Sequence, residues 1–176
     1  MNIPNSITIF RIILIPIIVV LMLTNIPYGG SLAAAIFLFA ALTDSLDGYL
    51  ARRWKQTTKL GAILDPVADK LLITAALISL VELGKLSGWI AIVIIGREFA
   101  VTGLRVVKAE EGVVIPASKM GKLKTISQVT AVMIIMLEQL IYPLAQLQLG
   151  QWVMYIAVII TLVSGIEYFL KNKITF

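Results

Sequence analysis

The sequence contains no cysteine and no histidine, and it has few charged residues for its length. Without cysteine the chain forms no disulfide, iron–sulfur cluster or thiolate zinc site. Without histidine it lacks the usual general base and the commonest metal ligand near neutral pH. Any acid–base chemistry therefore uses carboxylates, lysine, tyrosine or water. Any bound metal is a hard ion held by oxygen, such as magnesium, manganese or calcium.

Charged residues make up 14% of the 176 residues and hydrophobic residues 59%, with a mean hydropathy of +0.96. A soluble domain has about 25% charged residues, so the composition indicates an integral membrane protein. The length predicts one helical domain over residues 1–176. The net charge of +5 does not indicate nucleic-acid binding, because the basic residues are dispersed between apolar stretches. Membrane lipid and phosphorylated substrates are the expected anionic partners.

Six stretches have the roughly 20 mostly apolar residues that a membrane-spanning helix needs. They are residues 7–24, 32–53, 62–81, 88–107, 122–142 and 151–170. With the amino terminus inside, eight lysines and arginines fall in the inner segments, whereas the outer loops hold Lys85 alone. We therefore predict an all-α bundle of six transmembrane helices in a bacterial plasma membrane, with both termini cytoplasmic. The first residues are expected to form a short interfacial segment, with Asn5 or Ser6 capping the first helix.

Four aspartates lie at the adjoining ends of the second and third stretches: Asp44, Asp47, Asp65 and Asp69. Carboxylates at membrane depth are costly. The members of one pair are three residues apart and those of the other four, so each pair shares a helical face. Two such faces turned toward each other would form an oxygen cage for divalent ions, open to the cytosol and suited to phosphoryl transfer. The alternatives are helix-end ion pairs with neighbouring arginines and lysines, and a cation pathway in a transporter.

The aspartates belong to the run Asp44-x2-Asp47-Gly48-x2-Ala51-Arg52-x8-Gly61-x3-Asp65-x3-Asp69, which resembles the complete signature of the CDP-alcohol phosphotransferases. Residues 2–11, 97–105 and 121–125 are similar to the branch of this family that makes phosphatidylglycerophosphate in bacteria. The resemblance covers nearly the whole chain and implies six transmembrane helices and a homodimer. It also implies a magnesium- or manganese-dependent reaction in which sn-glycerol 3-phosphate displaces CMP from CDP-diacylglycerol.

Carried over by position, the resemblance implies two bound divalent cations and a CDP site. The metal ligands would be Asp44, Asp47, Asp65 and Asp69. The residues of the CDP site would be Asn5, Thr8, Asp44, Asp47, Gly48, Ala51, Arg52, Gly61 and Asp65. Asp69 would also be the general base, in agreement with the absence of histidine.

A second group of candidate residues is cationic. Arg97 lies midway along the fourth stretch, where an arginine without a partner is costly. Arg105 lies on nearly the same helical face, and Lys122 and Lys124 open the fifth stretch at the same membrane side. We expect these four to bind the phosphate of glycerol 3-phosphate. The alternatives are membrane anchoring by the lysines and an ion pair between Arg97 and Glu98. Adjacent side chains diverge by about 100° on a helix, so this pair is expected to face each other poorly.

Other acceptors, and other classes of protein, are also compatible with the sequence. Within the family the acceptor could instead be serine, inositol phosphate or phosphatidylglycerol, although the cations argue against an uncharged one. From other classes, a divalent-cation transporter would use the aspartates as a pathway, and a membrane scaffold would use them for no chemistry. No further acid lies deep in the first three stretches to continue such a pathway.

Overall fold

The structure is a computed structural model that describes residues 3–24, 26–54, 59–113, 115, 118–138 and 148–172, without the side chains of residues 3–4, 44–60, 62–63 and 119. Within these ranges the chain forms helices and no strand. The helices are α1 (Ile3–Leu23), α2 (Gly29–Trp54), α3 (Lys59–Glu82), α4 (Gly88–Glu110), α5 (Lys119–Glu138) and α7 (Leu149–Lys171). The predicted all-α architecture is confirmed.

Each predicted stretch falls on one of these helices, and most of the helices extend further than the apolar residues do. α4, for example, continues to Glu110, because helical hydrogen bonding does not end where hydrophobicity ends. The predicted cap at Asn5 or Ser6 is wrong. α1 already includes Ile3, and the Asn5 side chain is buried within the bundle instead of closing a helix end. Residues 139–142 of the fifth predicted stretch lie outside the described residues.

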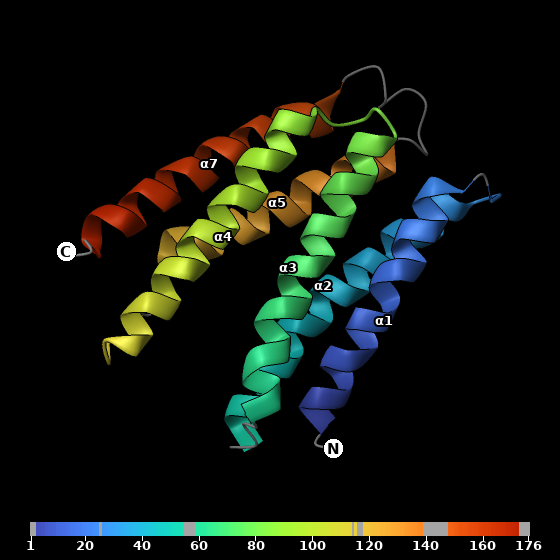
Figure 1. The fold of residues 1–176 in the computed structure, drawn as a ribbon. Helices are drawn as coiled ribbons and strands as arrows, with labels where there is room; N and C mark the ends of the chain where they lie inside the picture. The colour runs from blue at the N-terminus through green and yellow to red at the C-terminus, as the bar shows by residue number, and fades with distance from the viewer. Residues whose placement is uncertain are drawn as a thin grey trace.

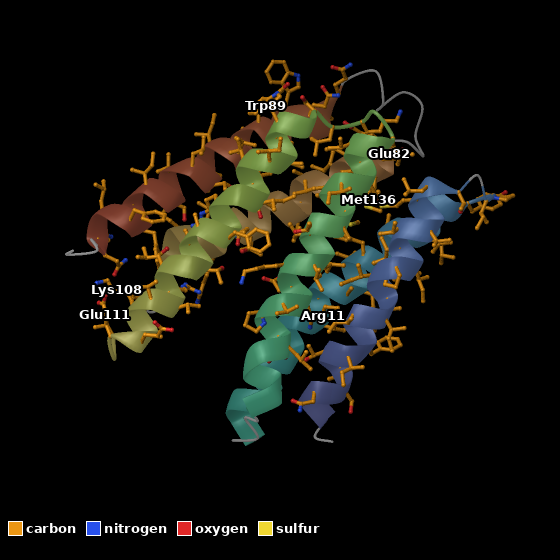
Figure 2. The ribbon with its side chains drawn as sticks, viewed as in Figure 1. Arg11, Glu82, Trp89, Lys108, Glu111 and Met136 are labelled. Carbon is orange, nitrogen blue, oxygen red and sulfur yellow. The ribbon has the colours of Figure 1, made fainter. Side chains whose placement is uncertain are left out.

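Three of the described helices are long and apolar enough to cross a membrane: α1 over Asn5–Leu23, α5 over Met120–Glu138 and α7 over Leu149–Lys171. Large apolar side chains cover much of the outer surface, and Ile92 on α4 is 72% exposed. Figure 2 shows side chains projecting outward along the helices, with Trp89 near one end of the bundle and Lys108 and Glu111 near the other. An extended apolar exterior of this kind is consistent with a membrane protein.

The helices form two groups of three (Figure 1). In the amino-terminal half α1 packs on both α2 and α3, and in the carboxy-terminal half α7 packs on both α4 and α5. Contacts of α2 with α5, and of α3 with α4 and α5, join the halves. One continuous apolar core crosses the boundary; its members include Phe37, Leu77, Ile94, Val132 and Met154.

The turn between α3 and α4 reverses the chain and so places their polar ends together. Gly84 has a φ of +67°, and the backbone N–H of Lys85 donates to the carbonyl of Leu80 at 2.9 Å. This is the hydrogen bond of a Schellman motif, which ends α3 and needs a residue in the left-handed region. In Figure 1 this turn lies at the upper right, opposite the two chain ends. The start of α3 and the end of α4 therefore lie on the same side as the termini.

Candidate active site

The first part of the site is a buried polar face on α1. Asn5, Thr8 and Arg11 recur every three residues, and all three side chains are at most 6% exposed in a mostly apolar helix. The Thr8 hydroxyl donates a hydrogen bond to Oδ1 of Asp65 on α3, at 2.6 Å. Two residues that the family resemblance implies for the CDP site are thus in contact across 57 positions of sequence.

The acidic residues of the signature lie on α2 and α3, which pack against each other. On α3, Asp65 and Asp69 are one turn apart and partly buried, and Gly61 is buried one turn before them. On α2 the backbone at Asp44 and Asp47 is helical. The remaining signature positions of α2 are Gly48, Ala51 and Arg52. The side chains at these five α2 positions lie outside the described residues, so the predicted convergence of four carboxylates stays a prediction.

The described donors fit a hard divalent cation. Asp65 makes no ion pair with a described residue, and the hydrogen bond that it accepts comes from the neutral Thr8 hydroxyl. The alternative of helix-end ion pairs is not tested, because most of the arginine and lysine side chains near the four acids lie outside the described ones. Oxygen is the only donor type that Asp65, Asp69 and Thr8 offer, and hard cations prefer oxygen. Among the described side chains no three potential ligands cluster. A complete site would require Asp44 and Asp47.

A cavity of about 450 Å³ lies between α3, α4, α5 and α7, at the end of the bundle that carries the aspartates. Five of the predicted site residues line it: Asp69, Arg97, Arg105, Lys122 and Lys124. Lys70 and Glu98 are further charged residues of its wall. The predicted proton acceptor and the predicted phosphate-binding cations therefore share one space, in which the cations outnumber the carboxylates.

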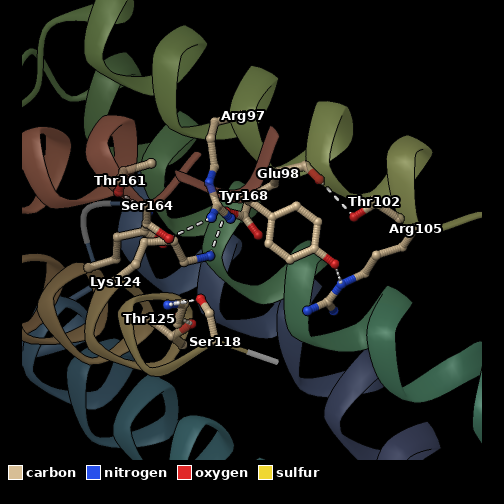
Figure 3. Close-up of polar contacts among 12 residues, drawn as sticks. Arg97, Glu98, Thr102, Arg105, Ser118, Lys124, Thr125, Thr161, Ser164 and Tyr168 are labelled. Carbon is tan, nitrogen blue, oxygen red and sulfur yellow. Dashed lines mark hydrogen bonds and ion pairs between the residues drawn. The ribbon is translucent and has the colours of Figure 1, made fainter. Parts of the chain in front are cut away.

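Arg97 reaches from α4 across to α7 (Figure 3). Its Nη2 donates to the Ser164 hydroxyl at 2.8 Å, and its Nη1 donates to Oε1 of Glu98 at 3.0 Å. The same Glu98 oxygen accepts a hydrogen bond from Nζ of Lys124 at 2.5 Å. The expectation that Arg97 and Glu98 face each other poorly is therefore wrong. Both side chains are long enough to bend back toward each other, despite the angle between their Cα–Cβ bonds.

Arg105 lies nearer the end of α4 and contacts a different residue of α7 (Figure 3). Its Nε donates to the Tyr168 hydroxyl at 2.8 Å, and its guanidinium carbon lies 5.3 Å from the centre of the Tyr168 ring. That distance is within the range of a cation–π interaction. Tyr168 itself is buried against Val101 and Leu104 of α4. Lys122 is the more exposed of the two predicted cations on α5, and its ammonium group makes no hydrogen bond to another described residue, although its backbone N–H donates to the Ser118 carbonyl.

Sequence reasoning missed the contribution of α7 and left Glu98 without a role. A signal was present, because Thr161, Ser164 and Tyr168 recur at spacings of three and four in a mostly apolar helix. All three side chains are buried. A polar stripe that an apolar helix turns inward marks a contact with polar groups on other helices.

Two glutamates outside the cavity, one on α5 and one on α7, have structural roles. Glu138 accepts a hydrogen bond from the backbone N–H of Gly150 at 2.8 Å, at the start of α7, where a carboxylate is favoured by the helix dipole. Glu167 pairs with Lys171 one turn further along the exposed side of α7. Neither residue lines the cavity.

An all-helical chain with apolar outer faces, and with carboxylates and cations gathered in one internal cavity, has the make-up of a membrane protein that acts on phosphorylated substrates. Comparison with known sequences narrows this class. The CDP-alcohol phosphatidyltransferase family matches residues 1–163, and the chain belongs to this family. The family resemblance predicted from the sequence is confirmed.

Three bacterial relatives cover nearly the whole chain. The sequence is 44% identical to a protein of Bacillus subtilis (strain 168), over 97% of this chain and 95% of the relative. It is 43% identical to one of Haemophilus influenzae, over 95% and 91% of the two chains. It is 36% identical to one of Rickettsia typhi, over 99% of each. All three relatives are named CDP-diacylglycerol–glycerol-3-phosphate 3-phosphatidyltransferase.

Proposed function

We propose that this chain transfers the phosphatidyl group of CDP-diacylglycerol to sn-glycerol 3-phosphate, giving phosphatidylglycerophosphate and CMP. Membership of the CDP-alcohol phosphatidyltransferase family and the names of the relatives support this reaction. The observation that carries it is the shared cavity, in which Asp69 faces the same space as Arg97, Arg105 and Lys124. Such a space suits an acceptor that carries a hydroxyl at one end and a phosphate at the other.

The cations of the cavity bind the acceptor's phosphate, because guanidinium and ammonium groups donate charge-assisted hydrogen bonds to its oxygens. This holds the free hydroxyl beside Asp69. The hydroxyl oxygen attacks the phosphorus that bears the diacylglycerol, and its proton passes to the Asp69 carboxylate. The bond from that phosphorus to the oxygen of CMP breaks, and CMP leaves with the bridging oxygen.

The donor's pyrophosphate is bound in the amino-terminal half. Asp44, Asp47, Asp65 and Asp69 hold two divalent cations, Mg²⁺ or Mn²⁺, which neutralise pyrophosphate charge when they are bound. Thr8 holds the Asp65 carboxylate in place through its hydroxyl. The CDP moiety lies against Asn5, Thr8 and Gly61 and against the signature positions of α2: Gly48, Ala51 and Arg52.

The chain is a single domain of six membrane spans with both termini cytoplasmic, and it forms a homodimer in the bacterial plasma membrane. The distribution of lysine and arginine along the sequence supports this topology. So does the position of both chain ends on one side of the bundle. The cavity then faces the cytoplasm, the compartment in which a phosphorylated alcohol is available.

The test is CMP release by the purified protein in detergent or vesicles containing CDP-diacylglycerol. Glycerol 3-phosphate, serine, inositol phosphate and phosphatidylglycerol are supplied separately as acceptors. Only glycerol 3-phosphate is expected to drive release. EDTA should stop the reaction, and Mg²⁺ or Mn²⁺ should restore it. Release with none of the phosphorylated alcohols would overturn the proposal, and metal flux into liposomes without CMP release would favour a transporter.

A further inference from the structure

Ser164 and Tyr168 are the residues of α7 that reach the arginines of the cavity. Ser164 is 1% exposed and Tyr168 is 5% exposed, although the neighbouring Ile166 is 60% exposed. Thr161, one turn before Ser164, accepts a hydrogen bond from Gln128 of α5 and donates to its own helix, so it serves the packing of α5 on α7. Ser164 and Tyr168 instead contact α4, and both contacts end on an arginine.

Tyr168 contacts Arg105 in a way that leaves its anion-binding edge open. The hydroxyl accepts from Nε, and the ring lies under the guanidinium. Among the described residues the two terminal nitrogens of Arg105 make no hydrogen bond. These terminal nitrogens provide one edge for a bidentate contact with phosphate, and Arg105 is one of the residues that line the cavity.

Arg97 is held at its stem and at both terminal nitrogens, while its buried Nε has no hydrogen-bond partner among the described residues. Ser164 accepts from Nη2, and the aliphatic stem lies against Gly165, where an added Cβ would be 3.1 Å from Cγ of Arg97. Glu98 accepts from the other terminal nitrogen. Arginine loses much rotamer freedom when it binds an anion, so a side chain that is already fixed binds phosphate more tightly.

We propose that Tyr168 and Ser164 are positioning residues for the acceptor: they fix Arg105 and Arg97 in the orientation that binds the phosphate of a phosphorylated alcohol. This inference rests on the proposed function. It assigns α7 to acceptor selectivity, while donor binding and proton transfer stay with α1 to α3. The two residues act through the arginines and make no contact with the reacting atoms.

The test compares Tyr168→Phe and Ser164→Ala with Glu167→Gln, a control on the exposed side of the same helix. Tyr168→Phe keeps the ring and loses one hydrogen bond. It should raise the KM for glycerol 3-phosphate by roughly three- to tenfold, with kcat and the KM for CDP-diacylglycerol within about twofold of wild type. Ser164→Ala should shift the same constant in the same direction. Tyr168→Leu, which also loses the ring contact, should shift it further.

Competition with inorganic phosphate gives a second readout, because its inhibition constant should rise in parallel with that KM. An equal change in the constants of both substrates would indicate a purely structural role and would overturn the inference. An unchanged KM for glycerol 3-phosphate in both Tyr168→Phe and Ser164→Ala would do the same. In either case the wild type would still release CMP. If the proposed function itself were wrong, the wild type would release none, so the two failures are distinguishable.

Discussion

The candidate metal ligands in the amino-terminal half are acids, whereas the candidate phosphate-binding residues in the carboxy-terminal half are cations, and the two sets are arranged differently along the sequence. In the amino-terminal half the acids belong to one short run, and Asp65 is held by a neutral hydroxyl. In the carboxy-terminal half the cations lie on two helices, and a third helix holds the arginines in place. In the proposed function the acids bind the donor through metal ions, whereas the cations bind the acceptor directly. The cavity lies where the halves meet, so neither half alone holds the complete site.

Among the substitutions considered, replacing Asp69 should cause the largest loss of activity, because Asp69 is proposed both to bind metal at the donor site and to take the proton of the acceptor. Asp69→Asn should lower the rate of CMP release by about 10³-fold or more, because it removes the proposed proton acceptor. Glu82→Gln, an exposed acid near the far end of the same helix, is the matched control and should retain full activity. If Asp69→Asn kept more than a tenth of the wild-type rate, another group would have to take the proton.

Replacing a cation should instead affect mainly one substrate. Arg97→Ala should lower kcat/KM for glycerol 3-phosphate by about 30- to 100-fold, the loss typical of one partner of a buried charged contact. The KM for CDP-diacylglycerol should change much less. Lys108→Ala provides a control on the same helix, because Lys108 pairs with Glu111 at the end of α4 and does not line the cavity. If Arg97→Ala changed the kinetic constants for both substrates equally, the carboxy-terminal half could not be assigned to the acceptor alone.

The same contrast between the halves explains which features of the fold and the site could be predicted from the sequence alone. The helices were predictable because each contains a long apolar run, and the acidic positions because they lie within 26 residues at fixed spacing. The roles of Ser164 and Tyr168 were not predictable in this way. Their partners are 67 and 63 positions away, and only the packing of α7 on α4 brings them together. The pairing of Arg97 with Glu98 was misjudged because backbone geometry does not limit two long, flexible side chains.

A smaller effect is expected from Thr8, which contacts the proposed metal ligand Asp65 and is not itself proposed as a metal ligand. Thr8→Val keeps the shape of the side chain and removes the hydrogen bond to Asp65. We expect the Mg²⁺ concentration for half-maximal activity to rise by about tenfold, as when other supporting partners of metal ligands are lost. Thr8→Ser keeps the hydroxyl and should behave like wild type. A changed KM for glycerol 3-phosphate at saturating Mg²⁺ would contradict the assignment of Thr8 to the donor half.

The smallest functional effect is expected at the end of the bundle away from the cavity, where a glycine brings two helices close together in each half. An added Cβ would lie 2.5 Å from Cγ1 of Ile135 at Gly150, and 2.8 Å from the Leu21 carbonyl oxygen at Gly29. Next to the latter, Gly30 has open space.

Gly29→Ala should therefore lower the Tm, at an overpacking cost of about 1–3 kcal/mol. Gly30→Ala should leave the Tm equal or slightly higher, because alanine is the better helix former by up to about 1 kcal/mol. Thermal unfolding in detergent separates the two variants, and the KM values of both should match wild type because neither glycine lines the cavity. Equal Tm shifts would mean that helix propensity, and not the contact with α1, governs this end of α2. A selective rise in the KM for either substrate would mean that packing far from the cavity sets its geometry, which the division between the halves does not allow.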